Sequence, residues 1–280
     1  MHQNKNNGLD HKNKKHTICY KYKISSFINN NRDFYMLKKI VLVTALLGTF
    51  GLSHAYQAEV GGTIEILDRD QGGSDVGFSI DGTHYFSPVQ IKNYPLNEAA
   101  FLNRASNING ALSYVDDSEI FGIQAGIEYF VPNSDFYLSG SLSHFDNDFG
   151  DLTSYSAEAG YLPVPGLLVA LGLIGISEDD ADDEIDPTLR AKYVTQVGTY
   201  DMNFEAGASF GDIDAYNLGA DLYLDKTFSV GIGYTDSDLE GTDVFSIRAK
   251  KFFSQQFSLE GGITFGDSAD IFGVRGAYRF

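Results

Sequence analysis

Cysteine and tryptophan are almost absent from this 280-residue chain, which contains one Cys and no Trp. The single cysteine, Cys19, lies in a basic N-terminal stretch, so residues 56–280 contain none. That part of the chain can form neither disulfide bonds nor thiolate metal sites. It also lacks any apolar run of about 18 residues or more, which excludes a membrane-spanning helix there.

Basic residues are scarce beyond residue 55. Residues 1–55 hold nine of the 20 Lys and Arg but only two of the 38 Asp and Glu, which leaves 11 basic and 36 acidic side chains in residues 56–280. The resulting net charge of -25 excludes binding to nucleic acid through its phosphates.

Histidine is scarce as well, with only His84 and His144 in residues 56–280. A Ser–His hydrolase needs a His that has an orienting partner and stands beside a nucleophile. The two histidines fall near opposite ends of predicted strands, so we expect both at an interface or in the lumen, without a catalytic role. Asp236-Ser-Asp-Leu-Glu-Gly241 imitates the start of an EF-hand loop, but Ile247 stands where the bidentate Glu belongs. We therefore expect no catalytic residue, cofactor or specific metal site.

A complete signal peptide is predicted over residues 36–55. Lys38 and Lys39 follow Met36, an apolar core runs from Ile40 to Leu52, and Ser53 and Ala55 suit cleavage before Tyr56. Residues 1–35 are rich in Asn and Lys and have no periodicity. We interpret them as an extension produced by a start assigned too early, with a genuine long n-region as the alternative.

Apolar residues alternate with polar or small ones throughout residues 56–280, which is the signal of strands. In the first segment one face carries Tyr56, Ala58, Val60, Gly62, Ile64 and Ile66. Fourteen such runs are predicted, at 56–67, 76–86, 107–115, 120–130, 136–145, 152–162, 167–177, 188–197, 200–210, 215–224, 228–235, 244–252, 257–265 and 271–280. An even number of strands returns both chain ends to one side, as single-chain bacterial barrels require.

The connections between these runs alternate between two classes. Short turns such as Gly198-Thr199 are typical of the periplasmic side of a barrel, whereas the other class is acidic throughout, as in Asp236–Asp243. The pattern predicts an all-β fold, a transmembrane antiparallel up-and-down barrel of about fourteen strands with short periplasmic turns and acidic extracellular loops. The longest connection, 88–106, is expected on the periplasmic side, with a short helix over Pro95–Ala105 that packs under the barrel or partly plugs it.

Aromatic residues gather at strand ends, which predicts two girdles at the membrane interfaces. We place Tyr114, Phe121, Phe145, Tyr155, Phe210, Tyr216, Tyr234, Phe245, Phe265 and Phe272 in the outer girdle. The inner girdle is expected to contain Phe86, Tyr129, Phe136, Tyr161, Tyr200, Phe228, Phe257, Tyr278 and Phe280. A soluble β-sandwich also has alternating strands, but it predicts neither paired girdles nor a second face of small polar residues.

Three stretches carry a family resemblance: Tyr56-Gln-Ala-Glu-Val-Gly-Gly62, Gly82-Thr-His-Tyr-Phe-Ser-Pro-Val89 and Pro95-Leu-Asn-Glu-Ala-Ala-Phe-Leu-Asn-Arg-Ala-Ser-Asn-Ile108. Together with the strand pattern and the terminal Phe280, they resemble a porin family of gammaproteobacterial outer-membrane channels, over about residues 36–280. The resemblance implies passive uptake of small hydrophilic solutes. It supplies no motif that assigns individual channel residues.

The polar face of the predicted strands is the candidate pore lining. Its acidic members are Glu59, Glu65, Asp81, Glu128, Glu158, Asp201, Glu205, Asp221 and Glu260, and its basic members are Arg190, Lys192, Arg248, Lys250, Arg275 and Arg279. Two interpretations stay open. Opposed charges across a narrow pore could produce a transverse field that orients small zwitterions, or the charges could simply pair between neighbouring strands. Because acids are in excess at the rim, we expect a preference for cations.

The sequence thus predicts an outer-membrane porin in a Gram-negative bacterium. Its expected partners are outer-membrane lipid and lipopolysaccharide, the barrel-assembly machinery at the C-terminal strand, and small hydrophilic solutes. The alternatives are a closed barrel that acts in adhesion or structure through its acidic loops and, third, an outer-membrane hydrolase.

Overall fold

The computed structural model describes residues 55–70, 72–147, 150–178, 184–211, 214–238 and 242–280. The predicted extension and nearly all of the predicted signal peptide lie outside these residues. No helix among the described residues has the length and hydropathy needed to cross a membrane.

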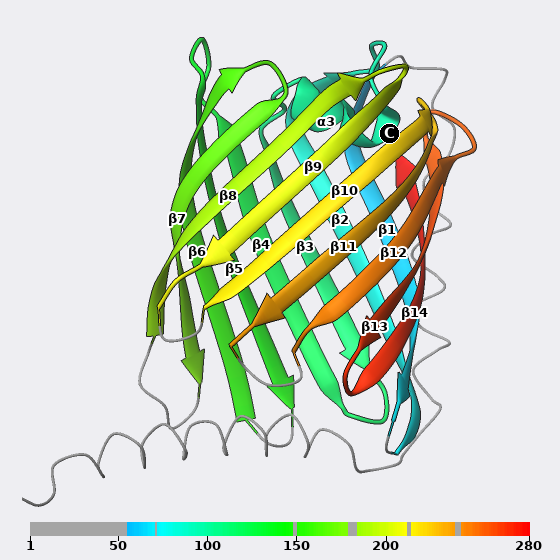
Figure 1. Cartoon of the computed structure of the whole chain (residues 1–280). Coiled ribbons are helices and arrows are strands. Elements are labelled where there is room, and N and C mark those ends of the chain that lie inside the picture. Colours follow the sequence, from blue (N-terminus) through cyan, green and yellow to red (C-terminus); the bar gives the residue numbers. More distant parts are fainter. Residues whose placement is uncertain (1–54, 71, 148–149, 179–183, 212–213, 239–241) are drawn as a thin grey trace, which may run out of the picture.

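Fourteen antiparallel strands form one closed barrel, in which each strand pairs with its neighbours in sequence and β1 pairs with β14 (Figure 1). The strands are β1 (Ala55–Arg69), β2 (Gly73–Gln90), β3 (Asn107–Val115), β4 (Ile120–Phe130), β5 (Phe136–Asn147), β6 (Gly150–Val164), β7 (Leu167–Glu178), β8 (Glu184–Val197), β9 (Tyr200–Ser209), β10 (Ala215–Asp225), β11 (Phe228–Ser237), β12 (Val244–Phe252), β13 (Phe257–Gly266) and β14 (Ala269–Arg279). The predicted fold class and strand number are confirmed.

The two ends of the barrel differ in their connections. At one end, here called the turn end, lie the start of β1, the end of β14 and the tight connections, together with the short helices η2 (Leu96–Glu98) and α3 (Ala99–Leu102) (Figure 1). The β6–β7 connection shows how such a turn is built. Pro165 fixes the φ angle at the first central position of the turn. Gly166 has a φ of +80° at the second central position, a conformation that residues with a side chain rarely adopt. The opposite end, the loop end, carries the acidic connections.

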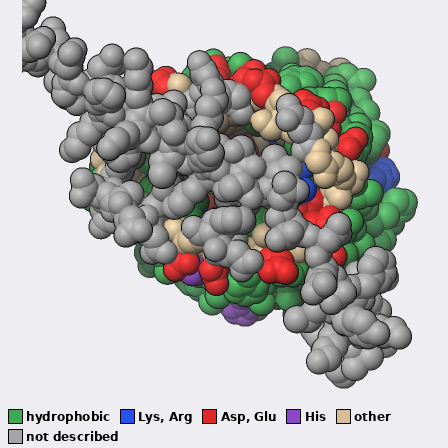
Figure 2. Space-filling view, turned by 90° about the horizontal axis from the view of Figure 1, so that it is seen from below, with side chains coloured by type: hydrophobic (Ala, Val, Ile, Leu, Met, Phe, Trp, Pro, Cys, Tyr) green, Lys and Arg blue, Asp and Glu red, His purple; other side chains and the backbone are tan. Residues whose placement is uncertain are grey.

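Alternation separates a lipid-facing wall from the lumen. On β7, Leu171 and Leu173 expose 67% and 53% of their surface on the outer wall, whereas Gly172 between them faces inward. Viewed from the loop end, the outer wall is largely hydrophobic and acidic side chains gather at the rim (Figure 2). This arrangement suits a barrel that is surrounded by lipid and encloses water.

Several strands extend further than the alternation predicted. β2 begins at Gly73 and continues to Gln90, and β8 begins at Glu184 within a predicted loop. The apolar–polar pattern marks only the part of a strand that meets lipid, whereas the backbone ladder continues beyond it. The helical stretch is shorter than predicted, because Pro95 caps η2 and α3 ends at Leu102.

Two aromatic side chains lie on the opposite face of the barrel wall from the one predicted. Tyr56 is buried rather than lipid-facing, because the pairing of β1 shifts between Tyr56 and Ala58. Gln57 N and Ala58 N both donate to Phe280 O, so β1 has a bulge of one extra residue there. The bulge turns Tyr56 inward. Phe145 faces the lumen instead of the outer girdle. It lies opposite inward-facing Gly122, where an added Cβ would meet its ring at 2.8 Å, whereas the neighbouring His144 faces out.

Candidate functional site

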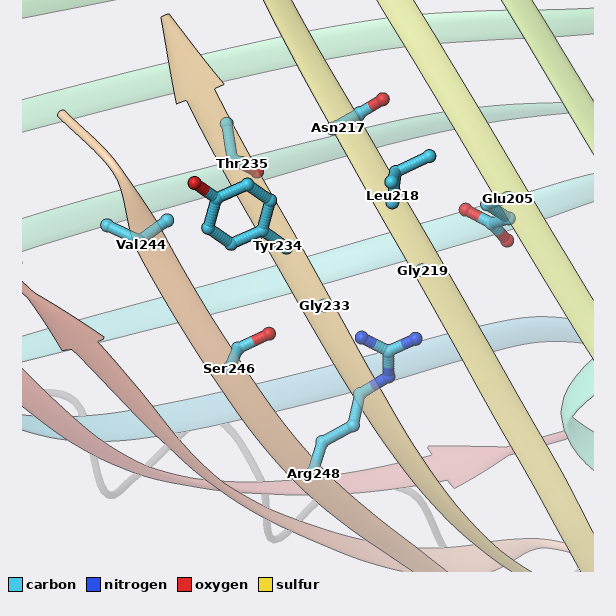
Figure 3. Close-up of a pocket in the computed structure, with 10 residues that line it drawn as sticks. All are labelled: Glu205, Asn217, Leu218, Gly219, Gly233, Tyr234, Thr235, Val244, Ser246 and Arg248. Atoms are coloured by element: carbon cyan, nitrogen blue, oxygen red, sulfur yellow. The ribbon is translucent and has the colours of Figure 1, made fainter.

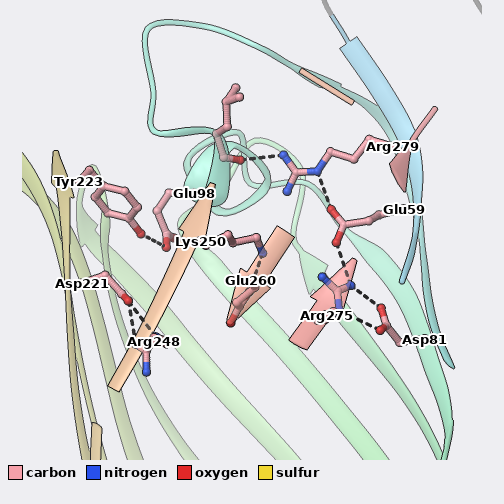
Figure 4. Close-up of polar contacts among 11 residues, drawn as sticks. Glu59, Asp81, Glu98, Asp221, Tyr223, Arg248, Lys250, Glu260, Arg275 and Arg279 are labelled. Carbon is pink, nitrogen blue, oxygen red and sulfur yellow. Dashed lines mark hydrogen bonds and ion pairs between the residues drawn. The ribbon is translucent and has the colours of Figure 1, made fainter. Parts of the chain in front are cut away.

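All fifteen charged residues of the predicted pore lining lie on the inward face of the barrel, most of them toward the turn end. Figure 4 shows those on β1, β2, β10, β12, β13 and β14 that point into the lumen there. Each of the six basic members is within 3.2 Å of a carboxylate. The partners come from the next strand or from the one beyond it. Of the two interpretations of the lumen charges, the geometry therefore favours pairing between nearby strands over a field between opposite walls.

Three of the arginines reach over a neighbouring strand to a carboxylate two strands away, and two of them cross that strand at a glycine. Arg275 on β14 crosses Gly61 of β1 to bind Asp81 on β2, where a Cβ at Gly61 would lie 2.4 Å from its Nη2. Arg248 on β12 crosses Gly231 of β11 to Asp221 on β10. Arg190 on β8 reaches over β7 to Glu158 on β6, with Ala170 as its own register partner on β7. We call these three groups the arginine straps. The straps of Arg275 and Arg248 can lie flat on the wall because the intervening strand has no side chain where they cross it.

The connection between β2 and β3 folds into the turn end of the lumen. It leaves the wall after Gln90 and returns at Asn107, and residues 91–106 are here called the plug segment. Leu96 N donates to Lys226 O in the β10–β11 turn at 2.8 Å, although β10 lies on the far side of the ring from β2 and β3. The plug segment therefore crosses the barrel from one wall to the other.

Glu98 is the main polar attachment of the plug segment. It is 3% exposed, accepts a hydrogen bond from Tyr223 Oη at 2.5 Å, and lies 3.0 Å from Lys192 Nζ. The same ammonium lies 5.2 Å from the centre of the Phe101 ring. The cation and the hydroxyl donor together offset the free energy of burying the carboxylate, so removal of either partner should destabilise the attachment.

Arg279 attaches the plug segment on the β14 side. Its guanidinium lies 4.5 Å from the ring centres of Tyr56 and Phe252, binds Glu59, and donates from Nη1 to Leu96 O at 2.9 Å (Figure 4). Around it, Tyr56 packs with Tyr85, Val89 and Ala99 in a buried cluster. The inward turn of Tyr56 thus supplies one face of the arginine's aromatic sandwich.

Two lumen carboxylates have no basic partner among the described residues. Glu128 accepts hydrogen bonds from Asn107 and from Tyr137 Oη, at 2.9 and 2.7 Å. Glu65 is exposed in the loop-end half of the lumen, beside inward-facing Gly77 and Gly273. These two positions carry negative charge that is not neutralised by a neighbouring cation.

The two histidines lie on the outer wall. His84 is exposed between Gly82 and Phe86, and His144 Nδ1 is 2.9 Å from the hydroxyl of Thr153. Within the described residues no group of three or more His, Cys, Asp or Glu could hold a metal ion.

Sequence reasoning missed the residues that hold the plug segment, chiefly Glu98, Phe101 and Tyr223. One signal was present: Glu98 is the only acidic residue in residues 88–106, the longest predicted connection. Its partners could not be found that way, because they stand more than ninety positions later in the chain.

Comparisons with known proteins fit this architecture. Residues 35–186 match the sequence model of the family described as "putative general bacterial porin". The chain belongs to this family. Among solved structures, the Acinetobacter baumannii outer membrane protein Omp33 is similar, with 28% identity, a TM-score of 0.69, and 81% of this chain and 99% of that one covered. The KdgM porin aligns at 12% identity and a TM-score of 0.41, over 79% of this chain and 99% of that one. No curated protein matches.

Family membership identifies this barrel as a porin and places it in the bacterial outer membrane. In such barrels short turns face the periplasm and longer loops face outward. The turn end with its plug segment is therefore the periplasmic end, and the acidic rim is extracellular.

Proposed function

We propose that this porin conducts small hydrophilic solutes passively and prefers cations. One observation carries the proposal: the lumen face is charged and polar, and Glu65 on β1 and Glu128 on β4 are lumen carboxylates without a basic partner among the described residues. The straps neutralise their own acids, so these two carboxylates dominate the local field. Negative groups that line a pore attract cations.

A closed barrel with a structural or adhesive role is the second candidate. The plug segment favours it, because its attachments to β8, β10 and β14 span the turn end. A catalytic role has no comparable support, because neither histidine faces the lumen.

Planar-bilayer recording with purified, folded protein separates the two candidates. The porin is expected to give ion current, and its reversal potential in a KCl gradient should have the sign of a higher permeability for K⁺ than for Cl⁻. Absence of current would support the closed barrel. A reversal potential of the opposite sign would refute the cation preference.

The origin of the preference is tested with two paired variants. Glu65→Gln/Glu128→Gln should reduce the reversal potential more than Asp238→Asn/Asp267→Asn, which removes two exposed rim charges. Rim charges are screened over a Debye length of about 10 Å at 0.1 M salt, whereas charges inside a narrow lumen are screened less. A larger effect of the rim pair would locate selectivity at the rim.

We further propose that residues 36–55 are removed on export, that the barrel-assembly machinery recognises the C-terminal strand, and that lipopolysaccharide contacts the rim. The family match begins at residue 35, next to Met36, which supports Met36 as the first residue of the exported precursor. N-terminal sequencing of protein extracted from outer membranes should begin at Tyr56, and a different first residue would contradict the proposed cleavage.

A further inference from the structure

A pocket of about 200 Å³ opens in the lumen wall where β9 to β12 run side by side (Figure 3). Gly219 and Gly233 form its floor. Glu205 from β9 and Arg248 from β12 border it, with Asn217 and Ser246 as further polar groups. Asn217 is close to the loop end of β10, whereas Tyr223, which holds the plug segment, is close to the turn end. A solute that enters from outside therefore meets this pocket before it meets the plug segment.

Both charged residues retain unused bonding capacity. Glu205 Oε1 accepts from Lys192 Nζ at 2.7 Å and from Asn203 Nδ2 at 2.9 Å, and Arg248 binds Asp221 through Nε and Nη2 at 2.8 and 2.9 Å. Among the described residues, nothing hydrogen-bonds to Glu205 Oε2 or Arg248 Nη1. The side chains of Glu205 and Arg248 are 49% and 35% exposed. One acceptor and one donor of opposite charge are thus available to a solute.

Gly219 keeps the space between them open. A Cβ at Gly219 would lie 3.8 Å from both Arg248 Nη2 and Glu205 Cβ. The two charged groups therefore flank a single residue position that has no side chain, and a solute with charges a few bonds apart can reach both.

The local charge balance selects the class of solute. Glu205 stands beside Lys192, and Arg248 stands beside Asp221, so these two wall pairs carry no net charge. Glu98 also binds Lys192, but it is 3% exposed and belongs to the plug segment, not to the lining of the pocket. A solute with net charge gains little from such a set, whereas a dipolar one can place its anion on the guanidinium and its cation on the carboxylate. We propose that this pocket is a binding subsite for zwitterions of amino-acid size, with the carboxylate at Arg248 and the ammonium at Glu205. This inference depends on the proposed porin function.

Liposome swelling measures the proposal directly, because the entry of a solute drives the volume change. Alanine serves as the zwitterion, and lactamide serves as a neutral molecule of nearly the same size. Neither has net charge, so a general preference for cations does not separate them. Wild-type porin should admit alanine at least about twofold faster than lactamide, which corresponds to a small binding advantage.

Two variants locate the effect. Glu205→Gln removes the charge, and the fold tolerates it because Lys192 keeps Glu98 as a partner. Gly219→Val keeps both charges and fills the space between them, and its Cβ would make ordinary contacts at 3.8 Å. Both should bring the two rates close to equality. Ser141→Val, on the lumen face of distant β5, adds similar bulk and should leave the preference unchanged.

The possible results distinguish a failure of the zwitterion subsite from a failure of the porin function. Equal entry of alanine and lactamide through the wild-type protein would overturn the subsite, while the porin function would stand. A preference that survives Gly219→Val would also overturn it. If neither solute enters and no ion current is seen, the porin function itself fails.

Discussion

Two of the three arginine straps depend on a residue that contributes no side chain. Gly61 and Gly231 lie where a long cationic side chain passes over the wall, and a Cβ there would come within 2.4 Å of Arg275 Nη2 and 2.1 Å of Asp221 Oδ1, respectively. The carboxylates that receive the arginines differ in exposure, from 7% of the side chain at Asp221 to 29% at Asp81. Glycine normally weakens a strand. Here it permits an ion pair to lie flat and leave the lumen open.

Gly61→Ala should therefore destabilise the barrel by about 1 kcal/mol, because the methyl group displaces Arg275 from Asp81 and leaves a partly buried carboxylate without its partner. Urea unfolding in phospholipid vesicles, followed by heat-modifiable gel mobility, measures this free energy. Gly77→Ala is the matched control, since its Cβ would make ordinary contacts at 3.7 Å. Equal stability of the two variants would show that the strap contributes nothing.

At the scale of elements, the sequence predicts strands well and their exact faces less well. Alternation located every strand, because each one has a wall that contacts lipid. It failed at Tyr56, where a bulge inserts one residue into β1. It also failed at Phe145, which was assigned to the outer girdle because it is aromatic. Leu138 and Leu142 face outward on β5, and Phe145 is an odd number of residues from both, so it faces inward. Bulges leave no signature in the alternation of side chains until the pairing partner is known.

The plug segment could be located in the sequence but its attachments could not. Its position follows from its length and place in the order of connections. That Glu98 binds Lys192 and Tyr223 depends on how a connection between β2 and β3 lies relative to β8 and β10 in three dimensions. The straps pose the same difficulty, because each requires the register of three strands at once.

Loss of the Glu98 charge should loosen the plug segment. Glu98→Gln retains an acceptor for Tyr223 but loses the ion pair with Lys192, which weakens the attachment by about 1–3 kcal/mol. Single-channel recordings should show more time at higher conductance, and trypsin should cut faster at Lys92 or Arg104 within the segment.

The control for the Glu98 variant is Glu260→Gln, which also removes a lumen carboxylate, but from a pair between β12 and β13; in the described part of the chain, neither Glu260 nor Lys250 has a hydrogen bond or ion pair to the plug segment. If Glu98→Gln matched Glu260→Gln in both conductance and trypsin resistance, the carboxylate would not be what holds the segment in place.

At the scale of the whole molecule, closure of the sheet removes every strand edge. β1 pairs with β14 from Glu59 to Arg69, and Phe280 N continues the pairing by donating to Ala58 O. In hydrocarbon an unpaired backbone edge would be costly, so a spanning sheet must close. The even strand number and the alternation of short and long connections made this predictable from the sequence, because both are properties of the chain order rather than of distant contacts.

The two walls of a closed barrel should respond differently to the same charge. Leu171 is 67% exposed near the middle of β7 on the outer wall, whereas Ser156 on neighbouring β6 faces the lumen and bonds to Ser141. Leu171→Arg should cost about 2–4 kcal/mol in vesicle unfolding, because the guanidinium enters the hydrocarbon band. Ser156→Arg keeps its charge in water and should cost less than about 1 kcal/mol. An unpaired charge has no compensating interaction in hydrocarbon, so the more costly of the two arginines marks the wall that contacts lipid. If Ser156→Arg cost more than Leu171→Arg, the face assigned to lipid would be the one in contact with water.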